Sequence, residues 1–370
     1  MKRIIHRAGN VLAPTLVAVS LLFGGCAEKL PVSDVVAHTD GIPGNTDTSF
    51  ADFAAQKTYQ KGNIRLIPGG EVFGVKFFTR GVIIVDTGVI ETEDGGIDPA
   101  REAGIAKNDV IRKIDGHSVN TVEEVAEKIA HSDGSPLQCE ICRGNHLFTA
   151  VLTPAKCRSD GTYKTGLWIR DSTAGIGTMT FYDASDGYFA GLGHGICDAD
   201  TGTLMPLLAG TVVDVTLTDI VRGKAGCPGE LKGSFSAEAR GSLSDNTACG
   251  VSGYLYDIPK KADALPVADK SEVHDGDAVI LSDIAGNGTE SYTVRLSAID
   301  RHASDTKCFS VEVTDERLLS VTGGIIQGMS GSPILQDGRL VGAVTHVLIG
   351  DPTKGYGIFA ENMLPLDKAA

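Results

Sequence analysis

The chain has little positive charge for its length of 370 residues: 33 lysines and arginines stand against 47 aspartates and glutamates, a formal net charge of -14. Proteins that bind nucleic acid neutralise phosphates with clustered lysine and arginine side chains. The acidic balance therefore excludes nucleic acid as an expected partner. Hydrophobic residues make up 42% of the chain, which is enough to form the cores of two or three domains.

The chain also lacks a clear membrane-spanning run. The N-terminal apolar stretch, 11–23, is shorter than the about 18 residues expected of a spanning helix. It follows the basic segment MKRIIHRAGN and precedes Gly24 and Gly25, which is the arrangement of an export signal. We therefore expect residues 1–30 to be an export signal or a short membrane anchor, with Cys26 either a lipidation site or a spacer cysteine.

Cysteines are too sparse for a scaffold held by disulfides, since only eight occur in the chain. Cys139 and Cys142 have no second pair of Cys or His at zinc-like spacing. Their context, PLQCEICRG, is typical of a strand, where residues three apart point to opposite faces. We expect buried structural cysteines, no metal site and no cofactor.

Residues 31–62 are polar, contain Gly, Pro, Ser and Thr, and show no sustained hydrophobic periodicity. This composition is typical of a flexible linker. Exposed linkers are also where proteolysis concentrates.

Residues 63–157 predict an α+β domain. Strand-like runs in NIRLIPGGEVFGVKFFTRGVIIVDTGVI are separated by glycine turns. TVEEVAEKIAHSDG predicts a helix, in which Thr121 and Glu124 have the spacing of a capping box. Between them, the residues of AREAGIAKNDVIRKIDG resemble the signature of bacterial PDZ domains.

The PDZ resemblance implies a groove between a strand and the Thr121 helix, where an extended peptide or a chain terminus adds as an extra strand. The segment PGGEVFGVKF is expected to supply backbone N–H groups for a terminal carboxylate. The residues assigned to this groove are Gly70, Val72, Phe73, Gly74 and Val75. The alternative is that Gly69, Gly70 and Gly74 only form turns.

Residues 158–370 predict a mostly β domain, because short strand-like segments alternate with glycines and Asp-Gly turns. A barrel or a sandwich is the expected architecture. Gly175 and Gly177 do not form a nucleotide-binding fingerprint, since no third glycine opens a helix there.

The stretch GGIIQGMSGSPILQDGRLVGAVTH, 323–346, has the features of a nucleophile turn at Ser330. Flanking glycines let the backbone bend so that the N–H groups of Gly328 and Ser330 converge on one point and form an oxyanion hole. The segment is not the G-x-S-x-G elbow, because Ser332 replaces the last glycine and no helix follows. A strand, an Asp-Gly hairpin and a second strand follow instead. This context resembles the nucleophile loop of chymotrypsin-like proteases.

A serine nucleophile needs a base, and several histidines are available. His194, in GLGHGI after a predicted strand, precedes Ser330 in the chain, which is the order found in chymotrypsin-like enzymes. His346 competes, while His274 and His302 lie in segments typical of solvated turns. A structural role is the ordinary alternative for any one of these histidines.

Three stretches that follow the export segment and the PDZ-like domain resemble the SpoIVB peptidase family. They are GLGHGICD, TGGIIQGMSGSPILQDGRLVGAVTHV and DPTKGYGIF. The resemblance covers roughly residues 63 to 365. It implies a PDZ-like domain followed by a chymotrypsin-like peptidase domain with two β-barrels. It also implies a sporulation signalling protease exported across the forespore membrane into the intermembrane space and membrane-associated at least before cleavage. Such a protease cleaves its own N-terminal segment and then a membrane-bound regulatory partner of a metalloprotease, which triggers processing of a mother-cell sigma factor precursor.

The same resemblance implies a catalytic triad of Ser330, His194 and Asp315. Residue-based reasoning alone favours an acid from the first barrel, where Asp198, Asp214 and Asp219 are the candidates, and interprets Asp315 as a turn residue or a helix cap.

Two other functions remain open at this level. The first is a PDZ-containing signalling adaptor whose protease-like domain is inactive, with Ser330 an ordinary turn residue. The second is a trimeric quality-control protease, but those enzymes carry the PDZ domain after the protease domain, whereas this chain has it first.

Overall fold

The computed structural model describes residues 57–60, 62–258 and 263–366. The expected export segment, and most of the expected linker, lie outside these described residues. In the first half of the chain the elements are β1 (Arg65–Pro68), β2 (Val72–Thr87), β3 (Ile90–Thr92), β4 (Gly95–Ile97), α1 (Pro99–Glu102), β5 (Asp109–Ile114), β6 (His117–Ser118), α2 (Val122–His131), β7 (Leu137–Arg143), β8 (His146–Leu152), β9 (Ala155–Lys156), β10 (Tyr163–Lys164) and β11 (Leu167–Tyr182). In the second half they are β12 (Tyr188–Gly191), β13 (Leu207–Val221), β14 (Glu230–Thr247), β15 (Gly250–Leu255), β16 (Leu265–Pro266), β17 (Gly276–Ser282), β18 (Glu290–Ser297), β19 (Phe309–Val313), α3 (Glu316–Thr322), β20 (Pro333–Gln336), β21 (Arg339–Leu348), β22 (Asp351–Phe359) and α4 (Ala360–Met363).

Two β-barrels form the larger body of the molecule. In barrel 1, β2 pairs with β11 and β13, and β12, β15 and β14 complete the ring between those two strands. Barrel 2 is closed in the order β17-β18-β19-β22-β21-β20. Every strand pairing in both barrels is antiparallel. The expected mainly β architecture with two barrels is confirmed.

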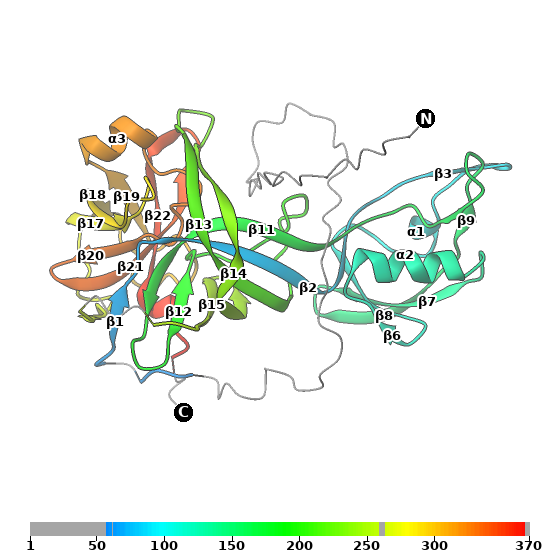
Figure 1. The fold of residues 1–370 in the computed structure, drawn as a ribbon, viewed down its shortest axis with the longest axis horizontal. Helices are drawn as coiled ribbons and strands as arrows, with labels where there is room; N and C mark the ends of the chain where they lie inside the picture. The colour runs from blue at the N-terminus through cyan, green and yellow to red at the C-terminus, as the bar shows by residue number, and fades with distance from the viewer. Residues whose placement is uncertain (1–56, 61, 259–262, 367–370) are drawn as a thin grey trace, which may run out of the picture.

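A smaller α+β body carries α1 and α2 and is joined to barrel 1 by two long strands. Figure 1 shows β2 and β11 running from the barrels into this body. Val75 of β2 pairs with β11 and β13 inside barrel 1, whereas Val82 and Ile83 pair with β5. The α+β body is therefore an insertion between β2 and β11, and residues 63–79, which the sequence analysis grouped with the PDZ-like domain, lie with barrel 1.

The strand β2 changes partners at a local irregularity. Gly81 has a φ of +84°, a conformation that residues with a Cβ rarely adopt, and its N–H donates to Asn120 Oδ1 at 2.9 Å. The Thr79 hydroxyl donates to the carbonyl of Asp171 at 2.9 Å. These bonds fix the point at which the chain leaves barrel 1.

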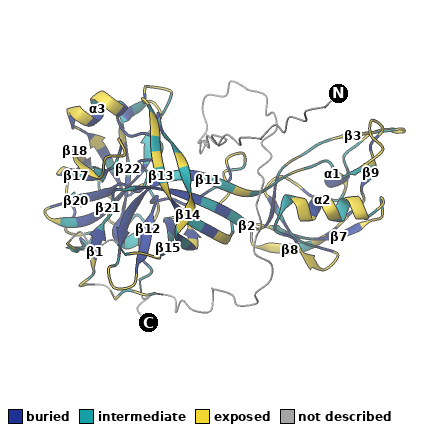
Figure 2. Ribbon diagram, viewed as in Figure 1, coloured by how far each residue is buried: buried dark blue, intermediate teal, exposed yellow. Residues whose placement is uncertain are grey.

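Local sequence explains the helix of the α+β body. Thr121 and Glu124 form the expected capping box, and the side chain of Thr121 accepts the Glu124 N–H at 3.1 Å. Val125 is the fully buried residue of α2, and it packs in a core with Ile111 and Ile141 of the neighbouring strands. Figure 2 shows the opposite, exposed face of this helix.

The cysteines of the described residues form no disulfides. The seven cysteines in the described part of the chain are free, and Cys139 is buried while Cys142 is half-buried on the same strand.

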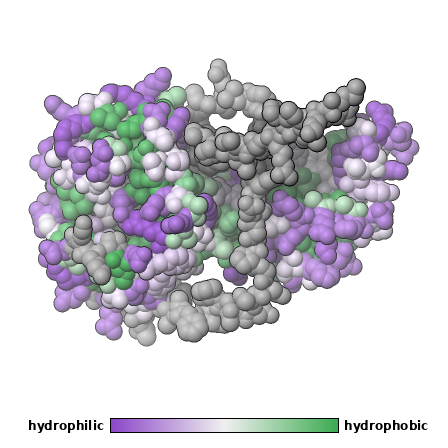
Figure 3. All heavy atoms as spheres, in the orientation of Figure 1, coloured by the Kyte–Doolittle hydropathy of each residue, from purple (hydrophilic) through white to green (hydrophobic). Residues whose placement is uncertain are grey.

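Within the described residues no cluster of His, Cys, Asp or Glu has the arrangement of a metal site. No helix in that same part is long and apolar enough to cross a membrane. Figure 3 shows a mostly hydrophilic surface on the visible face, with smaller hydrophobic patches over the barrels.

Candidate active site

The Ser330 turn lies between α3 and β20 and is held against barrel 1. Thr178 of β11 donates its N–H to the carbonyl of Ser330 at 2.9 Å and its hydroxyl to the carbonyl of Gly328 at 2.7 Å. Gly331 has a φ of +96°, and a Cβ there would lie 2.0 Å from Thr178 O. Only glycine allows this close approach between the two barrels.

The two residues predicted to form the oxyanion hole are Gly328 and Ser330. Gly328 has a φ of +97°, which bends the chain just before the serine. Among the described residues, the backbone N–H groups of Met329, Gly331 and Ser332 donate to other carbonyls of the fold. Within the described structure, Gly328 and Ser330 donate their N–H groups to no other backbone carbonyl, so their role as oxyanion donors stays a prediction.

Ser330 is less buried than Ser332, the other serine of this turn. Its side chain is half-buried and donates to the carbonyl of Thr345 at 2.8 Å. Ser332 is fully buried.

His194 lies in a corner directly after β12. Leu192 and Gly193 both have a φ of +67°, and the backbone of Leu192 is packed against Gly331 of the serine turn. The His194 side chain is buried, and its Nδ1 lies 3.0 Å from the carbonyl oxygen of Gly195. A carbonyl only accepts, so Nδ1 carries the proton and Nε2 of the neutral ring is the basic atom. Burial lowers the pKa of His194, which favours this neutral form.

His346 is the second histidine of the site. Its ring centroid lies 5.1 Å from that of His194. The preceding Thr345 directs its hydroxyl into barrel 2, toward the carbonyls of Thr306 and Tyr356, so the next side chain on the strand points the other way. Burial lowers the pKa of His346 to about 4, with further contributions from His194 and Lys307. Ser330 Oγ donates to Thr345, and His346, the next residue, lies beside His194, so the serine turn and both candidate bases lie in one region.

Asp315, the predicted acid, lies at the start of α3. Asp315 is the N-cap of α3, where its carboxylate accepts the backbone N–H groups of Arg317 and Leu318. It also forms an ion pair with Arg317 at 3.0 Å and accepts the N–H of Thr293 at 3.3 Å. The Arg317 side chain, with these N–H groups, lowers the pKa of Asp315. These contacts are those of a helix cap, and the assignment of Asp315 as the acid that orients His194 stays a prediction.

The acids of barrel 1 are also bonded elsewhere. Asp198 is buried and forms an ion pair with Arg170 at 2.6 Å. Asp214 is exposed beside Arg240, and Asp219 accepts its neighbour's N–H on an exposed part of β13. The hydrogen bond at Nδ1 of His194 goes to a backbone carbonyl, a contact that residue types in the sequence do not reveal.

The remaining histidine candidates lie on the surface. His274 is exposed and its Nε2 lies 2.8 Å from Asp337, whose side chain is also exposed. His302 is exposed in the turn before β19. Both positions agree with the expectation of solvated turns.

The residues assigned to the peptide groove do not line a groove in the described structure. The set Gly70, Val72, Phe73, Gly74 and Val75 lies in barrel 1 or at its edge. Phe73 is fully buried, and Gly74 pairs with Ile176 on one side and Val213 on the other. Since both edges of β2 are occupied there, no peptide strand adds to it. The alternation of apolar residues predicted the strand correctly, but that pattern does not say which sheet contains it.

Comparisons with known proteins agree with this architecture. A family model described as SpoIVB peptidase S55 matches residues 161–364, more than half of the chain. A PDZ domain model matches residues 75–153. A putative zinc metalloprotease of Clostridium perfringens is 36% identical over 69 residues, which are 19% of this chain and 20% of that protein. The chain thus spans about a fifth of the length of this curated relative.

Solved structures of proteases resemble the chain at low similarity. The inactive form of the Rv3671c protease of M. tuberculosis is 14% identical, with a TM-score of 0.29, and the match covers 51% of this chain and 78% of that one. The HtrA-type protease AlgW with a tripeptide is 14% identical, with a TM-score of 0.31, and the match covers 52% of this chain and 54% of that one. On the family match, the chain belongs to the SpoIVB peptidase S55 family and is a serine endopeptidase that carries a PDZ domain.

Proposed function

We propose that this endopeptidase is a sporulation signalling protease that is exported from the forespore, cleaves itself, and then cleaves the membrane-bound regulatory partner of a metalloprotease. That second cleavage triggers processing of a mother-cell sigma factor precursor. The observation that carries the proposal is the family match over residues 161–364. Two contacts support it: the Ser330 hydroxyl donates to Thr345, and the neighbouring His346 ring lies beside His194. A peptidase acts on protein substrates, and the chain's own N-terminal segment is the first of them.

The chemistry proposed for the site is acyl transfer. Ser330 Oγ attacks the carbonyl carbon of the scissile bond while its proton passes to Nε2 of His194. The N–H groups of Gly328 and Ser330 stabilise the negative oxygen of the tetrahedral intermediate. His194 then gives the proton to the leaving amine, and water hydrolyses the acyl-enzyme.

A substrate strand has an edge to pair with beside the serine. Pairing between β20 and β21 ends at Ala343 in the described structure, and β21 continues to Leu348. The stretch from Thr345 to Leu348 therefore presents one edge next to Ser330. An extended substrate adding to this edge is placed with its carbonyl at the serine.

Contacts at the start of the described chain limit where self-cleavage occurs. Lys57 Nζ lies 2.7 Å from Asp183 and 2.6 Å from Asp186, while the Tyr59 N–H donates to the carbonyl of Pro365 at 2.9 Å. A peptide bond must be extended within the active site to be cut, and residues 57–59 are instead bonded to barrel 1 and the C-terminal segment. We therefore place the self-cleavage sites on the N-terminal side of Lys57.

The experiment that tests this function follows the intact mass of the exported chain over time beside its Ser330→Ala variant. The native chain is expected to lose N-terminal fragments whose new ends precede Lys57, and the variant to keep its full length. Addition of the membrane partner's soluble domain then yields fragments only with the native chain. Equal shortening in both proteins contradicts self-cleavage, and failure of both activities favours the inactive adaptor.

The PDZ domain supplies a second peptide site in this proposal. Along Leu167–Arg170, β11 pairs only with β2 among the described strands, and α2 lies near its other edge. Trp168 on this strand is 65% exposed. We propose that an extended segment adds to this edge of β11, in place of the groove predicted at Gly70–Val75.

A further inference from the structure

The loop that carries His194 also contains a buried charge. This loop, residues 192–206, connects β12 to β13, and Asp198 lies four residues after His194. Asp198 is 1% exposed. One of its carboxylate oxygens accepts the N–H groups of Asp200 at 3.1 Å and Thr201 at 2.9 Å. A buried carboxylate also needs a positive partner, because its desolvation is otherwise uncompensated.

Arg170 provides that partner from outside the loop. Its two terminal nitrogens each lie 2.6 Å from an aspartate oxygen, one from Asp198 and one from Asp200. Arg170 pairs with Ile83 on β2, at the point where β11 passes from the PDZ domain into barrel 1. A second contact comes from the PDZ domain itself, where Lys107 Nζ donates to the carbonyl of Asp200 at 2.7 Å. The tip of the His194 loop is therefore bonded to the strand and the domain next to it.

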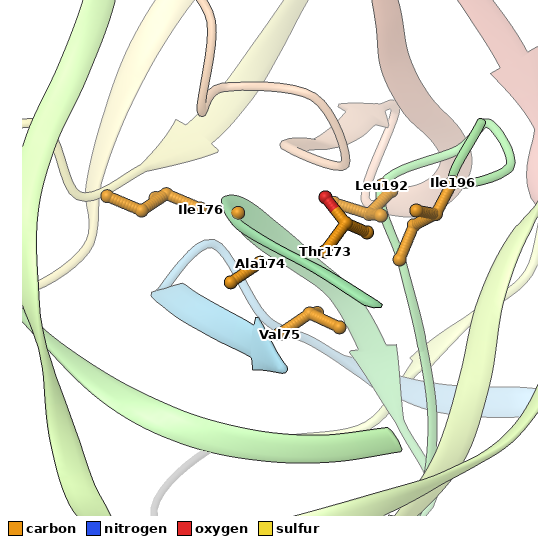
Figure 4. Close-up of a pocket in the computed structure, with 7 residues that line it drawn as sticks. Val75, Thr173, Ala174, Ile176, Leu192 and Ile196 are labelled. Carbon is orange, nitrogen blue, oxygen red and sulfur yellow. The ribbon is translucent and has the colours of Figure 1, made fainter. Parts of the chain in front are cut away.

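Apolar packing and hydrogen bonds both hold the loop from beneath. Leu192 and Ile196, on either side of His194, line a small apolar cavity together with Thr173 to Ile176 of β11 and with Val75. Figure 4 shows these residues of β11, β2 and the loop around the cavity. Leu192 and Ile196 are both buried, so apolar packing contributes to holding the loop. Asn246 adds polar anchors, with its side chain bonded to Ile196 and Met205 at 2.8–2.9 Å.

We propose that Arg170 and Asp198 are a positioning pair for the peptidase reaction: they hold the 192–206 loop so that His194 faces Ser330. Because Arg170 belongs to the strand shared with the PDZ domain, the pair also makes the placement of His194 depend on that domain. The inference rests on the proposed role of His194 as the base. Arg170 touches neither the substrate nor the reacting atoms.

The pair acts on the catalytic step more than on substrate binding. Loss of Arg170 leaves the Asp198 charge buried without its partner, and the loop tip must then move to reach water. A displacement of about 1 Å in a catalytic group costs on the order of 100-fold in rate. The substrate edge on β21 belongs to barrel 2 and is unchanged by this movement. The expected signature is a lower kcat at a nearly constant KM.

The test compares Arg170→Met, Asp198→Asn and the double variant with the full native chain. The substrate is a peptide that spans the mapped self-cleavage site. We expect about a 100-fold loss of kcat in Arg170→Met with KM within about twofold. The double variant is expected to lose no more than the worse single variant, since both changes break one interaction. Arg295→Met is the matched control, because it breaks the exposed ion pair with Asp277 and is expected to leave kcat unchanged.

Hydrogen exchange provides a second readout that does not need activity. Amides of residues 195–205 are expected to exchange at least about tenfold faster in Arg170→Met than in the native chain or Arg295→Met. If the native chain neither cleaves nor reacts with a serine-directed reagent, the proposed function fails. The exchange measurement still tests whether the Arg170–Asp198 pair holds the 192–206 loop. If Arg170→Met does not fold, Asp198→Asn is used in its place, since its side-chain carbonyl still accepts the loop N–H groups. Unchanged kcat together with unchanged exchange overturns the proposal.

Discussion

The ring centroids of His194 and His346 lie 5.1 Å apart, and Thr345, the residue before His346, accepts the Ser330 hydroxyl. Both have a lowered pKa, chiefly because both are removed from water. The proton on Nδ1 of His194 is bonded to Gly195 O, which leaves Nε2 as the base. A neutral His346 does not oppose the positive charge that His194 acquires during the reaction, whereas a protonated one does.

The first prediction concerns pH. The unfolded chain binds protons at these histidines near pH 6.5, and the folded chain does not until a lower pH, about 4 for His346. Stability is therefore expected to fall as the pH decreases from about 6.5 to about 4. The acidic limb of kcat/KM is expected below pH 6.5 for the same reason. Thermal unfolding and peptide hydrolysis measured across this range check both statements.

Two histidine variants provide the control for that prediction. His346→Gln removes one lowered pKa and is expected to flatten the dependence of Tm on pH between about 4 and 6.5. His274→Gln is the contrast, because Asp337 raises the pKa of His274 and its stabilisation is present at low pH and lost as the pH rises. A native chain whose Tm is constant over this range contradicts the account.

The second prediction separates the helix cap from the catalytic acid. Asn caps helices about as well as Asp, and the Arg317 side chain paired with Asp315 is 62% exposed, so Asp315→Asn is expected to change stability little. We expect kcat to stay within about tenfold of the native value, since loss of an orienting acid costs on the order of 10⁴-fold. Steady-state kinetics of the purified variant give the answer. A loss of kcat near 10⁴-fold with an unchanged Tm would identify Asp315 as the acid of the triad.

The third prediction uses two glycines with positive φ. In Gly331→Ala the new Cβ lies 2.0 Å from Thr178 O, so the serine turn must move away from barrel 1, and kcat is expected to fall by more than about 100-fold. Gly338→Ala meets open space in the hairpin after β20. It is expected to cost only about 1 kcal/mol of stability and to retain activity. Activities and melting curves of the two variants, measured together, distinguish a local packing effect from general strain. Equal kcat values for the two variants contradict the requirement for close contact between the serine turn and Thr178.

The fourth prediction concerns the PDZ edge. Trp168 is the single tryptophan of the chain and is exposed on β11. A synthetic peptide with the sequence of residues 31–62, titrated into the Ser330→Ala variant, is expected to shift the Trp168 emission to shorter wavelength as the indole leaves water. Calorimetry on the same samples reports binding independently. Binding without any change in emission places the peptide elsewhere.

Particular residues show how far the sequence predicts this structure. The Ser330 turn, the position of His194 and the capping box at Thr121 follow from local patterns, because glycine spacing and cap spacing act within a few residues. The partner of a strand is not local, so β2 was assigned to the PDZ-like domain although its first half lies in barrel 1. The Arg170–Asp198 pair was missed for the same reason, since the two residues are 28 positions apart with no motif between them.

The central claim is that Ser330 is the nucleophile of an active peptidase site. Its most direct test is labelling of the folded chain with a fluorophosphonate, followed by intact mass and peptide mapping. The account predicts one adduct on Ser330 in the native chain, one adduct in Ser332→Ala, and none in Ser330→Ala. An unlabelled native chain, or an adduct that persists in Ser330→Ala, contradicts it.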